Sequence, residues 1–305
     1  MQTRRDFLLR TGSLSAACFV PAPALLRPAG AAGLFRISLA QWSLHRTLRS
    51  GDLDNLEFAD RARKFGIDGI EYVNQFFKDK AADFTYLSEM NKRAEGAGVE
   101  NLIVMIDGEG TLGADDASQR RKAVENHFKW IAAARFLGCH AIRVNAGGSG
   151  DWEEQKRLAA DSLHRLAEFG DEYGIDVIVE NHGGLSSNGE WLAATIQMAG
   201  HKRVGTLPDF GNFRIQKDEW YDRYKGVREL MPFAKAVSAK SHAFDGEGSE
   251  TGTDYERMMR IVLDAGYRGW VGIEFEGQGP EDEGITKTQA LLEKLRRRLA
   301  PEYQD

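Results

Sequence analysis

Short apolar segments typical of β-strands alternate with amphipathic helical segments along this chain, and this alternation constrains its fold more than any other feature. Successive strand-like segments begin roughly 30–40 residues apart, which is the spacing of βα units. The eight segments cover residues 35–40, 66–72, 99–106, 141–145, 175–180, 203–209, 234–242 and 270–276. Eight such units predict one α/β domain, a (β/α)8 barrel over residues 32–305, with an open doubly wound sheet as the lesser alternative.

Helices are predicted between these strands, and glycines mark several of their ends. The helical segments cover residues 52–65, 86–97, 118–137, 153–173, 191–198, 218–230, 254–265 and 282–299. The glycines are Gly66, Gly98, Gly138, Gly174 and Gly266, each just before the next strand. Glycine is favoured after the last helical turn because the chain there adopts a left-handed conformation.

The N-terminal region has the pattern of an export signal. Residues 3–8, T-R-R-D-F-L, match the twin-arginine pattern, an apolar run follows from Leu14 to Leu26, and A-x-A sites precede residue 32. We therefore expect residues 1–31 to be a cleaved signal that directs the protein through the twin-arginine export machinery to the periplasm. The remaining chain keeps one cysteine, Cys139, so no disulfide is predicted.

The charge balance excludes some classes of partner. The chain has 46 acidic and 40 basic side chains. Four of the arginines, against one aspartate, lie in the predicted signal, so the mature domain is more acidic than the formal net charge of -6. An acidic domain with no basic stripe is not expected to bind nucleic acid or an anionic membrane, and no other segment is apolar enough to span one.

Polar side chains stand at the end of each predicted strand. The carboxyl ends of parallel strands meet at one mouth of a barrel, where such folds place their active sites. The residues are Gln41, Trp42, Glu71, Asp107, Glu109, Asn145, Glu180, His182, Asp209, Asn212, Lys240, His242, Glu274 and Glu276. The last four strands thus supply carboxylates at Glu180, Asp209 and Glu274 and an imidazole at His242.

Three carboxylates beside an imidazole at one mouth would repel one another unless a cation neutralised them, and a divalent metal ion is the simplest such cation. Oxygen ligands with one nitrogen suit Mn2+, with Mg2+ or Co2+ as further candidates, whereas zinc sites carry more His or Cys. Strand alternation puts Glu274 and Glu276 on the same side of the eighth strand. The residues alone do not decide which of the two glutamates belongs to the site.

Each of these residues also has a structural interpretation. Glu180 could pair with a buried arginine, although a carboxylate directly after an apolar strand is costly to bury without a use. Asp209 could cap the following turn, and His242 could be a hydrogen-bonded core histidine. For Glu71, a salt bridge within the barrel and substrate binding are equally favoured, and Trp42 could stack on a ligand or only pack.

Ordered motifs give the chain a resemblance to a known family. They are V-E-N-H ending at His182, P-D-F-G-N from Pro208, A-K-S-H-A-F around His242 and G-Y-R-G-W-V-G-I-E-F-E-G ending at Gly277. With S-L-A-Q-W-S-L from Ser38, they extend over essentially the whole mature domain. The chain resembles the xylose isomerase-like TIM barrel superfamily, often labelled sugar phosphate isomerase/epimerase, and its exported members in particular.

The resemblance implies a ligand set and an acid/base pair. Glu180, Asp209, His242 and Glu274 would bind one divalent metal ion, commonly Mn2+, and the two glutamates would also flank the substrate as catalytic groups. The residues expected to bind the substrate are His182, Asn145, Lys240, Asn212, Glu71 and Trp42.

The implied reaction is isomerisation or epimerisation of a sugar or keto-sugar by proton transfer through an enediolate. The chain departs from better-known epimerases at Lys240, where many members carry a second His, and at Asn212, where sugar epimerases often place His. An alternative is a lyase that cleaves 3-keto-glycosides by β-elimination, because exported relatives in this superfamily have been linked to such substrates. A less favoured alternative is a non-catalytic sugar-binding protein, and the oligomeric state is left open.

Overall fold

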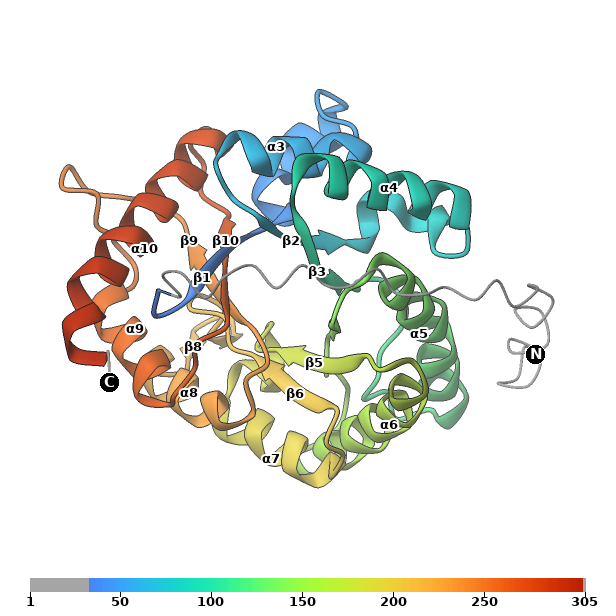
Figure 1. Ribbon diagram of the computed structural model, residues 1–305. Coiled ribbons are helices and arrows are strands. Elements are labelled where there is room, and N and C mark those ends of the chain that lie inside the picture. Colours follow the sequence, from blue (N-terminus) through green and yellow to red (C-terminus); the bar gives the residue numbers. More distant parts are fainter. Residues whose placement is uncertain (1–32, 304–305) are drawn as a thin grey trace.

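Eight parallel strands form a barrel surrounded by helices in the computed structural model, which describes residues 33–303 (Figure 1). The strands are β1 (Arg36–Ala40), β2 (Gly69–Val73), β3 (Glu100–Met105), β4 (Ala141–Val144), β5 (Asp176–Glu180), β6 (Val204–Leu207), β9 (Val237–Ser241) and β10 (Trp270–Phe275). Their order in the sheet is β6-β5-β4-β3-β2-β1-β10-β9, so each strand lies beside its neighbour in the chain and β1 lies beside β10. The predicted barrel is confirmed. The predicted signal, residues 1–31, lies outside the described residues.

Isolated bridges, instead of a continuous ladder, close the barrel between β6 and β9. Thr206 pairs with Ala234 and Asp209 with Ser238. The Ser238 amide donates to the Pro208 carbonyl over 2.9 Å. Pro208 has no N–H to give to a ladder, which explains why β6 ends one residue before it and not at the predicted residue 209.

Helices cover the outside of the barrel. They are α2 (His45–Ser50), α3 (Phe58–Lys64), α4 (Phe84–Ala97), α5 (Ala117–Leu137), α6 (Trp152–Tyr173), α7 (Gly189–Ala199), α8 (Arg223–Leu230), α9 (Tyr255–Asp264) and α10 (Glu281–Tyr303). Each helix from α4 to α9 follows an Asp or Asn whose side chain accepts a hydrogen bond from a first-turn amide. The glycines predicted at helix ends are left-handed, with φ between 67° at Gly98 and 79° at Gly138. No helix among the described residues is long and apolar enough to cross a membrane.

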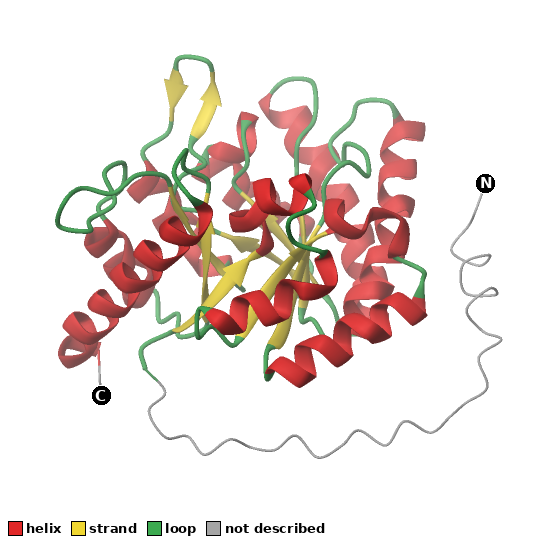
Figure 2. Cartoon of the chain, turned by 90° about the horizontal axis from the view of Figure 1, so that it is seen from above, coloured by secondary structure: helices red, strands yellow, loops and turns green. Residues whose placement is uncertain are grey.

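A two-stranded hairpin, β7 (Arg214–Gln216) and β8 (Glu219–Trp220), projects from the barrel between β6 and α8 (Figure 2). The sequence predicted a helix from residue 218, which is wrong for its first residues. The side chain of Asp222 accepts a hydrogen bond from the Lys225 amide and starts α8 only after the hairpin. Trp220 is 59% exposed at the hairpin.

Apolar side chains fill two regions of the barrel. The larger cluster packs between the strands and the helices and includes Phe35, Trp130 and Trp191. A smaller cluster, which includes Met105 and Ile178, lies on the inward faces of the strands. Side chains alternate along a strand, so the face that carries Ile178 in β5 also carries the residue two positions later, at the mouth.

Gly205 in β6 provides a test of the barrel closure. A Cβ atom there would lie 2.7 Å from the Phe233 carbonyl oxygen and 2.8 Å from the Lys235 side chain. We expect Gly205→Val to lower the free energy of unfolding by about 1–3 kcal/mol, because the closing segment must move away. Urea unfolding followed by circular dichroism measures this loss.

Gly96→Ala is the matched control. Gly96 lies near the end of α4 with open space around its Cα. Alanine favours the helix, so a gain of about 0.5–1 kcal/mol is expected. Equal stability of Gly205→Val and the wild type would show that the closing segment is not packed as described.

Candidate active site

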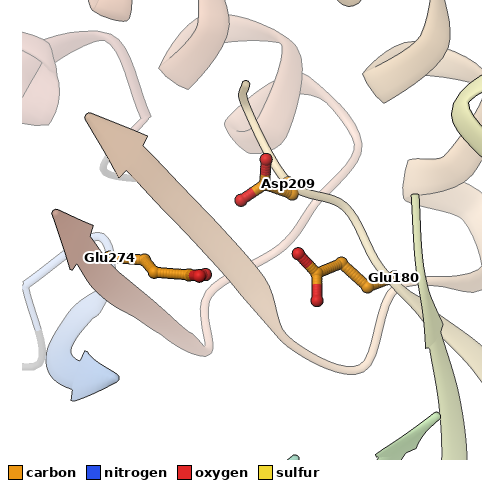
Figure 3. Close-up of side chains that lie close together, drawn as sticks. All are labelled: Glu180, Asp209 and Glu274. Atoms are coloured by element: carbon orange, nitrogen blue, oxygen red, sulfur yellow. The ribbon is translucent and has the colours of Figure 1, made fainter. Parts of the chain in front are cut away.

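Three buried carboxylates, Glu180, Asp209 and Glu274, converge at the C-terminal mouth of the barrel (Figure 3). One oxygen of each lies within 4.8 Å of the others. Glu180 ends β5, Asp209 follows β6 and Glu274 lies near the end of β10. Parallel strands end at the same edge, so residues distant in the sequence meet here. We call these three residues the acidic cluster.

The position of Asp209 is fixed by its neighbours in the chain. Its Oδ1 accepts hydrogen bonds from the amides of Gly211 and Asn212, each over 2.8 Å. The side chain of Asn181 accepts from the Asp209 amide over 2.8 Å and donates to its carbonyl over 3.0 Å. One oxygen of Asp209 therefore caps the turn, and the other remains directed at the acidic cluster.

Ser238 in β9 links two members of the acidic cluster. Its Oγ lies 2.7 Å from Oδ2 of Asp209 and 2.9 Å from Oε2 of Glu274. A hydroxyl has one proton, so it donates to only one of these oxygens at a time. The link holds the two carboxyl groups close together.

Lys240 places a positive charge beside the acidic cluster. Its Nζ donates to Glu274 Oε1 over 2.8 Å and to Glu276 Oε2 over 3.0 Å, and the residue is only 2% exposed. Burial would lower the pKa of Lys240, but the surrounding carboxylates raise it well above its usual value. Burial likewise would raise the pKa of Glu274, yet the ion pair with Lys240 lowers it.

Arg143, on the inward face of β4, is a second buried cation. It donates to Asp107 Oδ1 over 2.8 Å. Its Nε lies 2.9 Å from Glu180 Oε2, but the N–H is not directed at that oxygen, so the contact is an ion pair without a hydrogen bond. Burial raises the pKa of Asp107, but Arg143 more than compensates and holds it at about 2.

Three other carboxyl groups have raised pKa values because they are buried. Burial raises the pKa of Glu180 to about 7 against the opposing effect of Arg143. It also raises the pKa of Asp209 to about 7, which Lys240 opposes. The pKa of Glu71 rises to about 7 for the same reason, although Ser38 donates to it over 2.6 Å. Near neutral pH these groups can therefore carry protons.

Buried polar atoms without hydrogen-bond partners gather at this mouth. They are Glu71 Oε2, Arg143 Nε, Asn145 Oδ1 and Glu180 Oε2, four of the five such side-chain atoms found in the described part of the chain. Arg143 Nε and Glu180 Oε2 form an ion pair with each other. Glu71 Oε2 and Asn145 Oδ1 have neither an ion pair nor a hydrogen bond within the described residues, and since buried polar groups are normally paired, they mark a place where a ligand can supply the missing partners.

The structure brings most of the predicted site residues together. Asn212 donates to Glu180 Oε1 over 2.9 Å, and Asn145 donates to Asp107 Oδ1 over 2.8 Å. Trp42 donates from its indole nitrogen to Glu276 Oε1 over 2.9 Å, which ties the first strand to the last. Among the described residues Glu71 makes no ion pair, so the barrel salt bridge considered for it is not formed.

His242 and His182 lie apart from the acidic cluster. Both are exposed and line a cavity of about 410 Å³ beneath the hairpin, with Asn212 and Trp220. β9 ends at Ser241, so His242 lies beyond the strand. Its ring offers no nitrogen within 4.8 Å of the oxygens of all three carboxylates. The structure therefore does not bring the predicted imidazole ligand to the others.

Four residues of the site were not identified from the sequence. They are Arg143, Ser238, Asn181 and Ser38. Arg143 had a usable signal, because a lone charged residue stands within the apolar strand A-I-R-V. The other three are small polar residues whose partners are far away in the sequence, and the motifs that contain Ser38 and Asn181 do not show those partners.

The acidic cluster could hold a divalent metal ion, since three carboxylate oxygens lie within reach of a single cation. The complete predicted ligand set does not fit this structure. His242 is outside the cluster, and the ammonium group of Lys240, which is not a metal ligand while protonated, lies against Glu274 instead.

The barrel with the acidic cluster at its C-terminal mouth places this protein in a class of TIM barrels, those of the xylose isomerase-like type. A profile of the xylose isomerase-like TIM barrel family matches residues 59–296, and the chain belongs to this family. The fold is similar to a crystal structure of D-psicose 3-epimerase in the presence of D-fructose, with a TM-score of 0.67, 14% identity and coverage of 86% of this chain and 99% of that one.

Two related sequences are similar over parts of the chain. One, which bears the name "Putative hydroxypyruvate isomerase" and comes from Streptomyces coelicolor, is 28% identical over 165 residues, which cover 50% of this chain and 59% of the relative. The other is the C-glycoside deglycosidase alpha subunit of Arthrobacter globiformis, 32% identical over 94 residues, or 30% of this chain and 25% of the relative. Both matches span less than two thirds of the relatives' own lengths.

Arg143→Leu tests the buried charge balance. The substitution leaves Glu180 and Asp107 without their cation, so we expect the free energy of unfolding to fall by about 3–5 kcal/mol. Adding Glu180→Gln to this variant should recover part of the loss, because one of the two uncompensated charges is then removed. Denaturant unfolding of the single and double variants measures both effects.

The control is Arg165→Ala in α6, where the ion pair with Asp161 is exposed. Such pairs add little stability, so this variant should unfold like the wild type. If Arg143→Leu also unfolds like the wild type, Arg143 does not balance the buried carboxylates.

Proposed function

We propose that this protein is a sugar isomerase or epimerase that moves a proton beside a carbonyl group, with Glu180 and Glu274 as the transferring groups. The observation that carries the proposal is the convergence of these two buried glutamates, from β5 and β10, on one point of the barrel mouth. Membership of the family and the partial similarity to a hydroxypyruvate isomerase support the reaction class.

The charge states of the two glutamates suit opposite roles. Glu274 stays ionised beside Lys240 and takes the proton from the carbon next to the carbonyl, while the electrons of the C–H bond form an enediolate. Glu180, whose pKa is about 7, is divided between its protonated and ionised forms near neutral pH, and the protonated form can deliver a proton. Delivery of a proton to the former carbonyl carbon, with transfer of the hydroxyl proton to the former carbonyl oxygen, gives isomerisation, and delivery to the opposite face of the same carbon gives epimerisation.

Unpaired atoms and rim residues would orient the substrate. Asn145 Oδ1 and Glu71 Oε2 have no partner in the described residues and can accept hydrogen bonds from sugar hydroxyls. Asn212 lies against Glu180, and His182 lines the cavity beside it. Trp42 offers a partly exposed ring next to Glu276, which suits stacking on a sugar face.

Metal dependence and export remain predictions from the sequence. Mn2+, or Mg2+ or Co2+, is implied by the family resemblance for the acidic cluster. Export through the twin-arginine machinery to the periplasm rests on residues 1–31, which lie outside the described chain. A carbohydrate substrate is common to all of the proposals, and a homo-oligomer is left open.

A lyase acting on 3-keto-glycosides is the second candidate. The match to a C-glycoside deglycosidase subunit favours it, as does the space at the mouth. Two cavities of about 410 Å³ each flank His242, one under the hairpin and one lined by Phe244 and Phe275. In this reaction the same proton abstraction is followed by cleavage of the bond at the anomeric carbon, and the leaving group takes up a proton.

Deuterium exchange in D2O tests the proposed proton transfer. The protein is incubated with a panel of free sugars, 3-keto sugars and 3-keto-glycosides, and NMR follows deuterium incorporation and products. We expect incorporation at the carbon next to the carbonyl, and Glu180→Gln or Glu274→Gln should slow it by about 10²–10⁴-fold. Release of an aglycone would identify the lyase.

Glu168→Gln is the matched control for these substitutions. Glu168 is an exposed glutamate on α6, far from the mouth in the fold, and its replacement should leave exchange unchanged. Circular dichroism confirms that each variant is folded. Absence of exchange in every sugar would refute both enzymatic proposals and favour a sugar-binding protein.

A further inference from the structure

We propose that the ammonium group of Lys240 takes the place of a divalent metal ion in the acidic cluster, so that this site holds its carboxylates together and polarises its substrate without a metal. The cation position would then be filled by a side chain of the protein itself. The part of this inference that concerns substrate rests on the proposed function, whereas the part that concerns metal binding does not.

The lysine is built into the site by its strand partners. Lys240 in β9 stands opposite Glu274 in β10 in the parallel register, and both side chains face into the barrel. The ammonium group contacts Glu274 at 2.8 Å and Glu276 at 3.0 Å. Ser238 links Glu274 to Asp209 by contacts of 2.9 and 2.7 Å, so the ammonium group lies beside a linked pair of carboxyl groups.

Gly211 leaves room for the lysine stem. A Cβ atom at Gly211 would lie 2.7 Å from Lys240 Cγ and 3.2 Å from its Cβ. The turn that positions Asp209 therefore has no side chain where the stem passes toward the carboxylates. This close approach shows that the buried lysine and the Asp209 turn fit each other.

A metal ion and this ammonium group would compete for the same oxygens. A protonated lysine has no lone pair to give to a metal, and the ammonium group already lies 2.8 Å from Glu274 Oε1. A divalent ion bound to Glu274 would displace the buried ammonium group from that carboxylate and remove one of its two ion pairs. The imidazole of His242, which could have completed a metal site, is exposed instead.

The third ammonium proton remains for the substrate. Two protons go to Glu274 and Glu276, and no acceptor for the third is found among the described residues. It can be donated to the substrate carbonyl oxygen, which becomes negatively charged as the neighbouring C–H proton moves to a carboxylate. No oxidant, reductant or further reactant is needed for this step.

Metal analysis of the wild type and Lys240→His gives the test. Each purified full-length protein is treated with EDTA, equilibrated with Mn2+ and dialysed, and bound Mn2+ is measured by elemental analysis and electron paramagnetic resonance. We expect no stoichiometric Mn2+ in the wild type. Lys240→His removes the ammonium group and adds a nitrogen ligand beside three carboxylates, so this variant should bind one Mn2+ per chain.

Lys235→His is the matched control. Lys235 also forms a lysine–carboxylate ion pair, with Asp176 over 3.0 Å at the other end of β5, and this variant should gain no Mn2+. One Mn2+ per chain in the wild type would overturn the proposal. A folded Lys240→His that binds none would also count against it, since the cation position would then lie elsewhere. If that variant does not fold, the Mn2+ content of the wild type still decides the question.

Exchange after metal removal separates this inference from the proposed function. The wild type should retain its deuterium exchange after treatment with EDTA. Loss of exchange that Mn2+ restores would refute the metal-free site and leave the proposed function standing. Absence of exchange both with and without metal would refute the proposed function, while the Mn2+ stoichiometry would still decide on Lys240.

Discussion

The structure depends on burying several carboxyl groups inside one barrel without leaving their charges unbalanced. Removing an isolated charge from water costs several kcal/mol even after relaxation. Arg143 from β4 and Lys240 from β9 supply two cations, and raised pKa values allow other carboxyl groups to be neutral. Glycine makes the space: a Cβ at Gly272 would lie 2.6 Å from a Glu71 oxygen. The same buried groups therefore determine both the chemistry at the mouth and the packing beneath it.

Much of the fold could be predicted, because its determinants are local. Strand and helix periodicity and the glycines after helices gave eight βα units near their observed bounds. The strand ends gave Glu180, Asp209 and Glu274, because parallel strands deliver their last residues to one mouth. The β7–β8 hairpin was missed because its strands are short and polar, and the charged residues around it suit an exposed helix equally well.

The sequence could not show how far each residue at a strand end lies from the barrel interior. Lys240 and His242 were expected to share a side of the seventh predicted strand, but alternation does not say which one reaches the carboxylates. The strand ends at Ser241, so His242 lies at the solvent rim and Lys240 one step deeper, opposite Glu274. The partner of a buried charge depends on register between strands, which a single sequence does not show.

The closure of the barrel has a consequence for motion at the site. Regions with few backbone hydrogen bonds open locally more readily than those within a continuous ladder. β6 and β9 are joined only by isolated bridges, and the pair formed by Asp209 and Ser238 is one of them. Opening there would carry Asp209 away from Glu274 before the remaining strands separate. Pro208, which ends β6, therefore lies where the barrel is closed by isolated bridges, directly beside the acidic cluster.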